Sequence, residues 1–215
     1  FSEKFLLAGG LRYSLVFANM SFNNSDPVFV TDEITTTNAA LTGNINSIFK
    51  PGNGWKFDVV GSTGFRSPNI DDYGKVFVKR GDMVIPNPDL TPEYAYNAET
   101  SVTKSWYHVS LGGTIYHTWL RDAITKQDLG YTQIHEDEEV NVQTLMNTKE
   151  AYVRGVSLIG KWDVIKDIEN LGLSFEKSFN LQKGYDISND QPLGHIPPVY
   201  GKFITNFKIK NLETK

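Results

Sequence analysis

Apolar and polar side chains alternate along most of this chain, which is the period of a β-strand. In the run YHVSLGGTIYHTWL, residues 107–120, Leu111, Ile115 and Trp119 lie on one side and Thr114 on the other. An α-helix would repeat its apolar positions every ~3.6 residues. The alternation, clear or weak, marks the segments 5–17, 39–50, 55–65, 94–103, 107–120, 151–163, 170–181 and 202–210. The sequence predicts an all-β chain of about eight antiparallel strands without a convincing helix.

The connections between these segments alternate in length. Short, turn-like connections are expected at 51–54, 104–106 and 165–170, and long polar ones at 23–38, 66–93, 122–148 and 183–201. Compact soluble domains rarely carry several connections longer than ~12–15 residues. Outer-membrane barrels have short periplasmic turns and long extracellular loops, so the pattern favours a transmembrane β-barrel. On this reading, residues 66–93 form an extracellular loop that is neither helix nor strand.

The two faces of these strands differ in polarity, and in a membrane protein each would meet a different environment. In a barrel the apolar face meets lipid and the polar face meets a lumen, and the residues expected to face that lumen are Arg12, Lys56, Asp58, Asn97 and Glu99. Aromatic residues near strand ends would form girdles at the membrane interfaces: Trp55, Tyr94, Tyr96, Trp106, Tyr107, Trp119 and Trp162. Lys177 falls on the apolar face and fits only if it snorkels from a rim. A soluble sandwich with a second protein layer remains the alternative at this point.

Composition excludes several classes of function. The formal net charge of -4 gives no general attraction to nucleic acid, and the absence of cysteine removes thiolate metal sites and disulfide scaffolds. The four histidines lack metal-ligand spacing, so no metal site is expected, nor any cofactor. No nucleophile elbow, P-loop or dinucleotide-binding motif is present, so the chain is not expected to be an enzyme.

Two motifs carry a resemblance to a known family. GFRSPN at 64–69 and NPDLTPE at 87–93 are similar to the paired strand-end and downstream motifs of TonB-dependent outer-membrane receptors. The wider stretches FRSPNIDDYGKVF and VIPNPDLTPEYAYNAE resemble receptors of Bacteroidetes-type bacteria. RDAI at 121–124 and PLGHIPP at 192–198 match the same family in order. The resemblance covers most of 55–210, and residues 1–54 are compatible by pattern only.

The resemblance implies a barrel of about 22 strands closed by an N-terminal plug. Residues 1–215 would then be a partial barrel domain, about eight of those strands, without the plug, the early strands or the last strands. It implies a receptor in the outer membrane of a Gram-negative bacterium that imports a scarce nutrient, with a ferric siderophore or haem preferred. Its partners would be the TonB complex, acting through the missing plug, the lipid bilayer, the nutrient and a candidate surface protein.

Candidate ligand-binding or plug-contacting residues lie in the long connections: Arg66, Asn69, Asp71, Asp72, Arg80 and His135. Arg66 is expected on the lumenal side, where its guanidinium can bind a plug carboxylate or an anionic ligand in bidentate fashion. His135, in the acidic stretch IHEDEE, is the first choice for an axial haem ligand. The competing functions are a soluble glycan-binding module and a small complete barrel serving as an adhesin.

Overall fold

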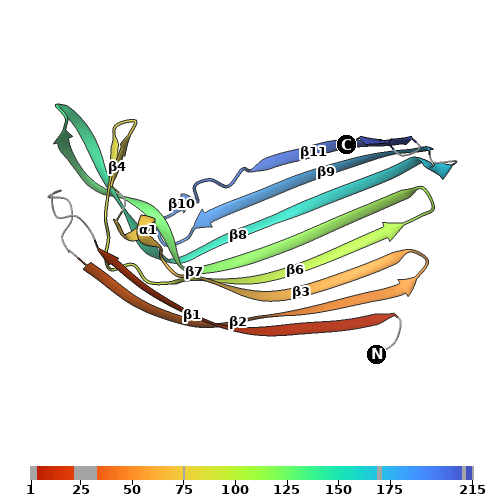
Figure 1. Cartoon of the computed structure of the whole chain (residues 1–215), viewed down its shortest axis with the longest axis horizontal. Coiled ribbons are helices and arrows are strands. Elements are labelled where there is room, and N and C mark those ends of the chain that lie inside the picture. The colour runs from red at the N-terminus through yellow and green to blue at the C-terminus, as the bar shows by residue number, and fades with distance from the viewer. Residues whose placement is uncertain (1–3, 22–32, 75, 169–170, 210–211, 215) are drawn as a thin grey trace.

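Eight long strands form one curved antiparallel sheet in the computed structural model (Figure 1), which describes residues 4–21, 33–74, 76–168, 171–209 and 212–214. In sheet order they are β1 (Phe5–Ser21), β2 (Glu33–Gly52), β3 (Trp55–Arg66), β6 (Glu93–Ser105), β7 (Val109–His135), β8 (Glu138–Ile168), β9 (Leu171–Asp186) and β11 (Val199–Ile209). The short elements are α1 (Ile70–Gly74), β4 (Phe77–Lys79), β5 (Asp82–Ile85), β10 (Gln191–Pro192) and β12 (Leu212–Thr214). The prediction of about eight antiparallel strands is confirmed.

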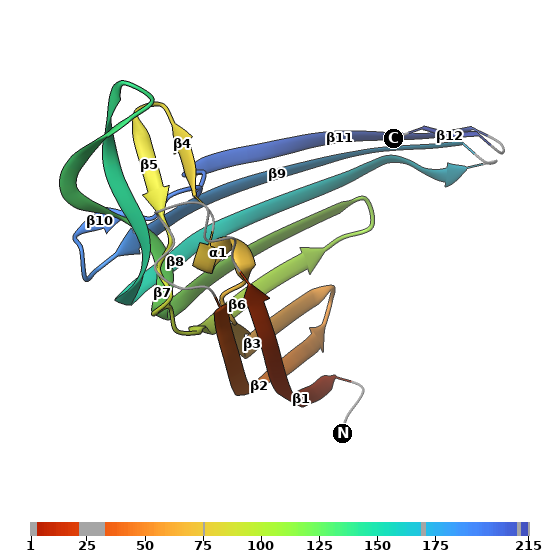
Figure 2. The same ribbon diagram turned by 60° about the vertical axis from the view of Figure 1, so that its left-hand side comes forward.

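The sheet is curved and open rather than closed on itself (Figure 2). Neighbours along the chain pair in simple up-and-down order, apart from the α1, β4 and β5 insertion between β3 and β6. Among the described residues no backbone pairing joins β1 to β11 or β12. The sheet therefore has the form of one section of a barrel wall.

One face of the sheet is apolar and stays exposed. Leu11 is 82% exposed, Ile115 60% and Val59 53%, although each lies in the middle of a long strand. The described part of the chain supplies no second layer over these side chains, as a soluble sandwich would. Exposed apolar surface on this scale requires a non-aqueous solvent or a partner, so the soluble alternative is wrong and the lipid-facing interpretation is supported.

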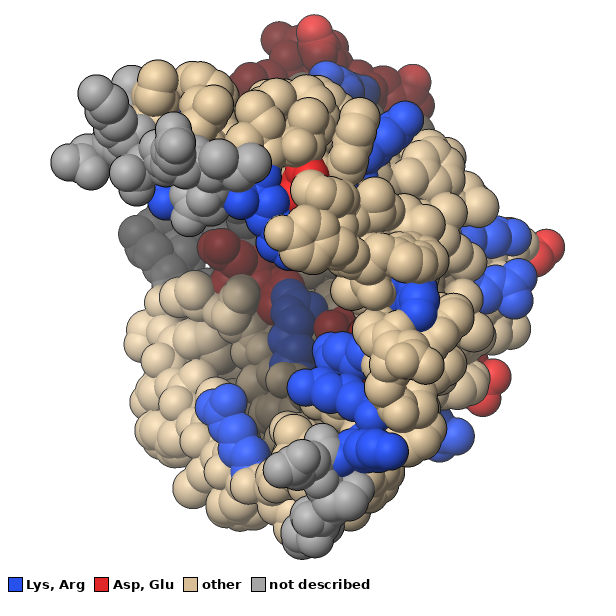
Figure 3. Space-filling view, turned by 90° about the vertical axis from the view of Figure 1, so that its right-hand side faces the viewer, with Lys and Arg blue, Asp and Glu red and all other residues tan. Residues whose placement is uncertain are grey.

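The opposite face is polar and cross-linked by side-chain contacts. Lys56 Nζ lies 2.9 Å from Asp58 Oδ1, and the Thr118 hydroxyl donates to Asn97 Oδ1 at 2.8 Å. Strand register also places Arg12 beside Thr42 and Glu99 beside Val60 on this face. Figure 3, from the end with the short turns, shows a hollowed interior with lysine and arginine side chains around it. The five side chains expected in the lumen therefore share one face, and their contact with a lumen stays a prediction.

Aromatic side chains gather at both ends of the apolar face. At the short-turn end Trp55 stacks on Phe57 with 5.8 Å between ring centroids, and the ammonium of Lys104 lies 5.0 Å from the Trp55 ring. At the other end Trp119 and Tyr152 face each other on β7 and β8. On β8, Tyr152 and Trp162 are ten residues apart, which is about 25 Å for a strand tilted by ~40°. This spacing matches the apolar thickness of an outer membrane.

The β2–β3 turn shows why this short connection contains glycine. Asn53 and Gly54 both have positive φ, 51° and 75°, the dihedral signs of a type I′ hairpin turn. A Cβ at Gly54 would lie 2.0 Å from the Ser105 carbonyl oxygen. The Lys104 ammonium donates to the Asn53 carbonyl and ties this turn to β6.

Three predicted long connections contain more regular structure than expected. Residues 122–148 are not a loop, because β7 and β8 continue as a paired ribbon to a two-residue turn at Glu136 and Asp137. Residues 66–93 contain α1 and the β4–β5 hairpin, and β5 adds to β8 in parallel. In 183–201, β9 continues to Asp186 and β10 pairs with it. These segments lack the alternation of apolar and polar residues that predicted the other strands. A ribbon that extends beyond the membrane has water on both sides, so neither of its faces needs to be apolar. Residues 22–32 of the connection 23–38 lie outside the described residues.

The one described helix, α1, has five residues. No described helix is long and apolar enough to cross a bilayer.

A lysine on each face tests which face meets lipid. Ile115→Lys should destabilise the protein by ~2–4 kcal/mol, the cost of a basic side chain at the lipid midplane. Val60→Lys, beside Glu99 on the polar face, is the matched control and should have little effect. Urea unfolding of the full-length protein refolded in lipid vesicles measures both. Equal losses would contradict the assignment of faces.

Candidate functional site

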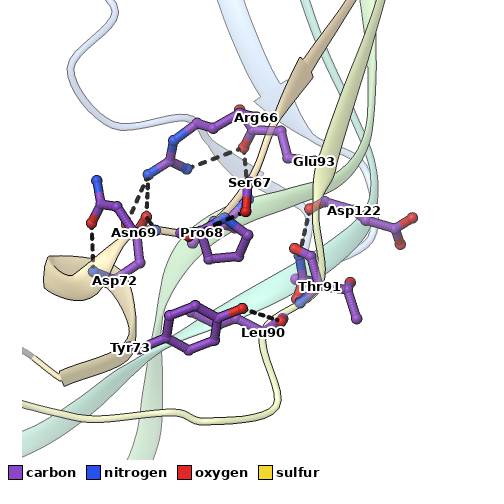
Figure 4. Close-up of polar contacts among 12 residues, drawn as sticks. Arg66, Ser67, Pro68, Asn69, Asp72, Tyr73, Leu90, Thr91, Glu93 and Asp122 are labelled. Carbon is purple, nitrogen blue, oxygen red and sulfur yellow. Dashed lines mark hydrogen bonds and ion pairs between the residues drawn. The ribbon is translucent and has the colours of Figure 1, made fainter. Parts of the chain in front are cut away.

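Arg66, at the end of β3, is the centre of an ionic cluster where the sheet meets its long connections (Figure 4). Its Nη2 lies 2.7 Å from both carboxylate oxygens of Asp72, and its Nη1 lies 3.7 Å from Glu93 Oε2. Register places Arg66 directly opposite Glu93 on the polar face. Two carboxylates of the described chain therefore already neutralise this guanidinium.

The helix α1 holds Asp72 in place. The Asn69 side chain accepts the Asp72 amide at 3.0 Å, and the Asp72 carboxylate accepts the Asn69 amide at 2.9 Å. This reciprocal arrangement is a capping box, which satisfies two amides at the start of a helix. The sequence spacing N-x-x-D could have indicated it. Arg66 thus binds a carboxylate whose position is set by the backbone.

Tyr73 anchors α1 to the chain below it. Its side chain is 1% exposed and packs in a small core with Met20, Ile34 and Leu90. The phenol donates to the Leu90 carbonyl oxygen at 3.1 Å, and burial raises the pKa of Tyr73 above its ordinary value. The tyrosine therefore joins the two receptor-like motifs, which are about twenty residues apart in sequence.

The second motif, NPDLTPE, lies outside the strands up to its last residue, Glu93, and is held by hydrogen bonds from asparagine side chains to backbone. Asn147 on β8 accepts the Thr91 amide at 2.8 Å and donates to the Thr91 carbonyl at 2.8 Å and to the Asp122 carbonyl at 2.6 Å. Asn87 donates to the Leu145 carbonyl at 2.8 Å. Asn147 thus satisfies the backbone groups of Thr91, which precedes a proline that has no amide to donate.

A cavity of about 530 Å³ opens beside the cluster, where Glu93 lies between β6 and the connection after β9. Glu93 accepts the Ile124 amide at 2.9 Å. Lys126, Asp186 and His195 also line the cavity, together with apolar side chains. It thus combines an apolar wall with both signs of charge, the composition of a small-molecule site.

The structure brings only some of the predicted site residues together. Arg66, Asn69 and Asp72 form one bonded cluster, whereas Asp71 is exposed on the helix and outside those bonds. Arg80 lies in the β4–β5 turn and His135 next to the β7–β8 turn, on separate hairpins. Sequence reasoning did not assign Tyr73 or Asn147 to the site. Both act through contacts far apart in sequence, which no local pattern reveals.

The ribbon of β7 and β8 carries a second polar junction beyond the sheet. Asp128 accepts the Gly130 amide at 2.7 Å and the Asn141 side-chain amide at 2.8 Å. These two hydrogen bonds hold the pKa of the Asp128 carboxyl below its ordinary value. Asn141 also donates its backbone amide to the Gly81 carbonyl at 2.7 Å, which joins the ribbon to the β4–β5 hairpin.

Comparison with known proteins now assigns the family. The family described as "TonB dependent receptor-like, beta-barrel" matches residues 1–212. This chain belongs to that family. The match accounts for the exposed apolar face and the aromatic ends, and it places the chain in the outer membrane of a Gram-negative bacterium, with its long connections on the extracellular side.

Individual relatives are similar over part of their length. The chain is 26% identical over 164 residues to the "Probable hemoglobin and hemoglobin-haptoglobin-binding protein 4" of Haemophilus influenzae, covering 72% of this chain and 16% of the relative. It is 31% identical over 144 residues to the "Hemoglobin and hemoglobin-haptoglobin-binding protein" of Haemophilus ducreyi, covering 63% and 15%. The solved structure of "Copper transporter OprC" shares the fold, with a TM-score of 0.70, 16% identity, and 97% of this chain and 31% of that chain covered. The chain spans about a sixth of the length of the curated relatives it matches. The Bacteroidetes-type source stays a prediction.

Removal of the asparagine side chain tests the anchor of the second motif. Asn147→Ala leaves the Thr91 backbone groups and the Asp122 carbonyl without their partner, at an expected cost of ~1–3 kcal/mol. Hydrogen exchange and limited proteolysis of 87–93 in the full-length receptor should both increase. Asn206→Ala, which loses one bond of 3.4 Å to Ser174, is the control and should leave this segment protected. Unchanged protection in Asn147→Ala would contradict the anchoring role.

Acidification tests the Asp128 junction. A carboxyl whose folded pKa is lowered contributes stability above its unfolded pKa, and this contribution is lost as the pH falls through the folded pKa. Exchange of the Gly130 amide, corrected for its intrinsic rate, should therefore increase below about pH 4. Asp128→Asn should remove this acid dependence. An identical pH profile in the variant would exclude the carboxylate as the cause.

Proposed function

We propose that the whole protein is an outer-membrane transporter that binds a scarce nutrient outside the cell and imports it with energy from TonB. In this proposal the present chain is a section of the barrel wall, with about eight of the strands of a larger plugged barrel. The plug, through which TonB acts in this family, would be another part of the same protein. The cavity beside Glu93, at the rim of the polar face, is the observation that carries the proposal.

A ferric chelate or haem is the proposed cargo class. Haem carries propionate carboxylates on an apolar ring, and many ferric chelates are anionic. The cavity offers an ammonium at Lys126 and an imidazole at His195 beside apolar side chains such as Leu120 and Ile196. The two Haemophilus relatives are named for binding hemoglobin, which favours haem iron. A host protein carrying haem is then the surface partner that fits this reading.

Histidine could contribute to haem binding at either of two positions. His135, at the tip of the β7–β8 ribbon, is placed to meet a cargo first and remains the proposed axial ligand. His195 has a positive φ of 61° and lies in the wall of the cavity, where it would contact cargo after entry. The tip and the cavity are thus proposed as successive contacts.

Arg66 is proposed to position the rim rather than to bind cargo directly. Its guanidinium is already held by Asp72 and Glu93, and Asp72 is held by α1. A plug carboxylate or an anionic cargo would add to this cluster. Asn69 would act through Asp72, whereas the exposed Asp71 and Arg80 are free to meet a ligand from solution. No catalytic role is proposed for any of them.

Growth of a receptor-deficient strain tests transport. The full-length receptor should restore growth on haem or a ferric siderophore as sole iron source, and only with functional TonB. Restoration that does not depend on TonB, as for a barrel adhesin, or no restoration on any iron source, would overturn the proposal.

Variants of the cavity test the site. Lys126→Gln with His195→Ala should weaken cargo binding by about tenfold or more, since a charge-assisted contact and a polar contact are both lost. Lys79→Gln, on the exposed β4 strand, is the control and should bind like the unmodified receptor. Titration of the purified receptor with haem measures each. Equal affinities for all three proteins would place the cargo site elsewhere.

A further inference from the structure

Three nitrogen-bearing side chains lie in one row on the apolar, lipid-facing side of the sheet. His117 on β7 is directly opposite Arg154 on β8, and Arg154 is directly opposite Lys183 on β9. Two residues along the same face lie Ile115 and Leu181, which are 60% and 50% exposed. The row thus interrupts an apolar surface with two permanent positive charges and an imidazole.

An aromatic row borders these side chains on the extracellular side. Trp119, Tyr152 and Tyr185 are paired across the same three strands. The Arg154 guanidinium carbon lies 4.9 Å from the Tyr152 ring centroid, and Lys183 Nζ lies 4.6 Å from the Tyr185 ring centroid. Both cations therefore lean toward the aromatic row, away from the membrane centre. This is the direction in which a basic side chain snorkels to reach a head-group region.

Neither cation is neutralised within the described part of the chain. Arg154 and Lys183 have no ion pair there. The Asp190 carboxylate accepts the Tyr185 hydroxyl at 2.5 Å, and Glu150, on the same face as Arg154, lies opposite Arg121. Nε2 of His117 is buried without a hydrogen-bond partner among the same residues. Uncompensated charge on a lipid-facing surface is costly unless it lies near an interface or meets an anion.

A cavity of about 420 Å³ adjoins the row. His117, Arg154 and Lys183 line it together with the apolar side chains of Val156 and Leu181. Arginine can bind phosphate in bidentate fashion and lysine binds it as a point charge. Val156 and Leu181, which lie toward the membrane centre, would contact an acyl chain. Charge at the upper end and apolar surface below it match one amphipathic molecule, a lipid with a phosphorylated head group.

We propose that His117, Arg154 and Lys183 form a binding site for the phosphorylated head group of an outer-leaflet membrane lipid. The site lies on the outside of the barrel wall and is distinct from the rim cavity that would receive cargo. Its ligand is part of the membrane itself. The site is independent of which nutrient the receptor carries.

Lys177, near the opposite end of the apolar face, gives an internal control. Lys177 is also on β9 and on the same apolar face, where it lies opposite Gly160 and Phe203. It is near the aromatic contact of Trp162 with Phe175 at the short-turn end. No second cation is paired with it across the strands. Lys177 can therefore snorkel to the periplasmic interface without forming a cluster.

Native mass spectrometry of the full-length receptor in neutral detergent tests the site. The probes are lipid A with two phosphates, the same lipid after phosphatase treatment, and phosphatidylcholine. The receptor should retain the bisphosphorylated lipid preferentially. Arg154→Gln with Lys183→Gln should weaken this retention by about tenfold or more, whereas Lys177→Gln should change it less than about twofold. Arg154→Lys with Lys183→Arg, which keeps both charges, should restore most of it.

Each opposite result would overturn the proposal. Equal retention of phosphorylated and dephosphorylated lipid would show that the basic side chains do not bind the phosphate groups. Equal losses in the Lys177 variant would show that any lipid-facing cation suffices. A protein partner that crosslinks to position 154 in membranes and excludes the lipid would assign this face to a protein interface. Heat-modifiable migration on gels confirms that each variant is folded. Haem titration of the same variants shows whether cargo binding is independent of lipid binding.

Discussion

Satisfaction of backbone hydrogen bonds in a medium without water is the constraint on which the rest of the structure depends. Hydrocarbon offers no partner to a free amide or carbonyl, so a chain that crosses it with strands must pair them edge to edge. Eight long strands paired with their neighbours meet this requirement within the sheet. The pairing frees the side chains to differ between faces, and the alternation of Ile115 with Thr114 and Tyr116 follows from it. Apolar exposure, a fault in a soluble protein, is here the adaptation to lipid.

The long connections obey a different rule because they lie in water. There the chain is held by specific polar contacts: the Arg66 guanidinium on Asp72, the Asn147 amide on Thr91, and the Tyr73 hydroxyl on Leu90. These contacts join different segments of the long connections, and Glu93, the second carboxylate beside Arg66, also lines the rim cavity. The proposed cargo site can therefore be preorganised while the proline-rich segment itself stays free of ladder bonds.

Charge is used differently on the two faces. On the inner face two lysines have carboxylate neighbours: Lys56 has Asp58, and Lys161 has Asp163. On the outer face Arg154 and Lys183 have tyrosine rings instead. A ring stabilises a cation without supplying a counter-charge, so the outer pair keeps its attraction for an anion. This difference separates the proposed lipid site from the polar contacts of the lumen side.

The sequence by itself determined the strands, the short turns, the two faces and the family, because a period of two and the Asn53–Gly54 turn are local properties that survive in a linear pattern. It also indicated Arg66 as a rim residue. Only the tertiary structure decided that residues 122–148 are a paired ribbon, that 66–93 contains a helix and a hairpin, and that Asn147 and Tyr73 anchor the motifs. Those outcomes depend on pairing between β5 and β8 and on contacts between distant segments. Such contacts are set by how the strands align in space, and no local window of sequence contains that information.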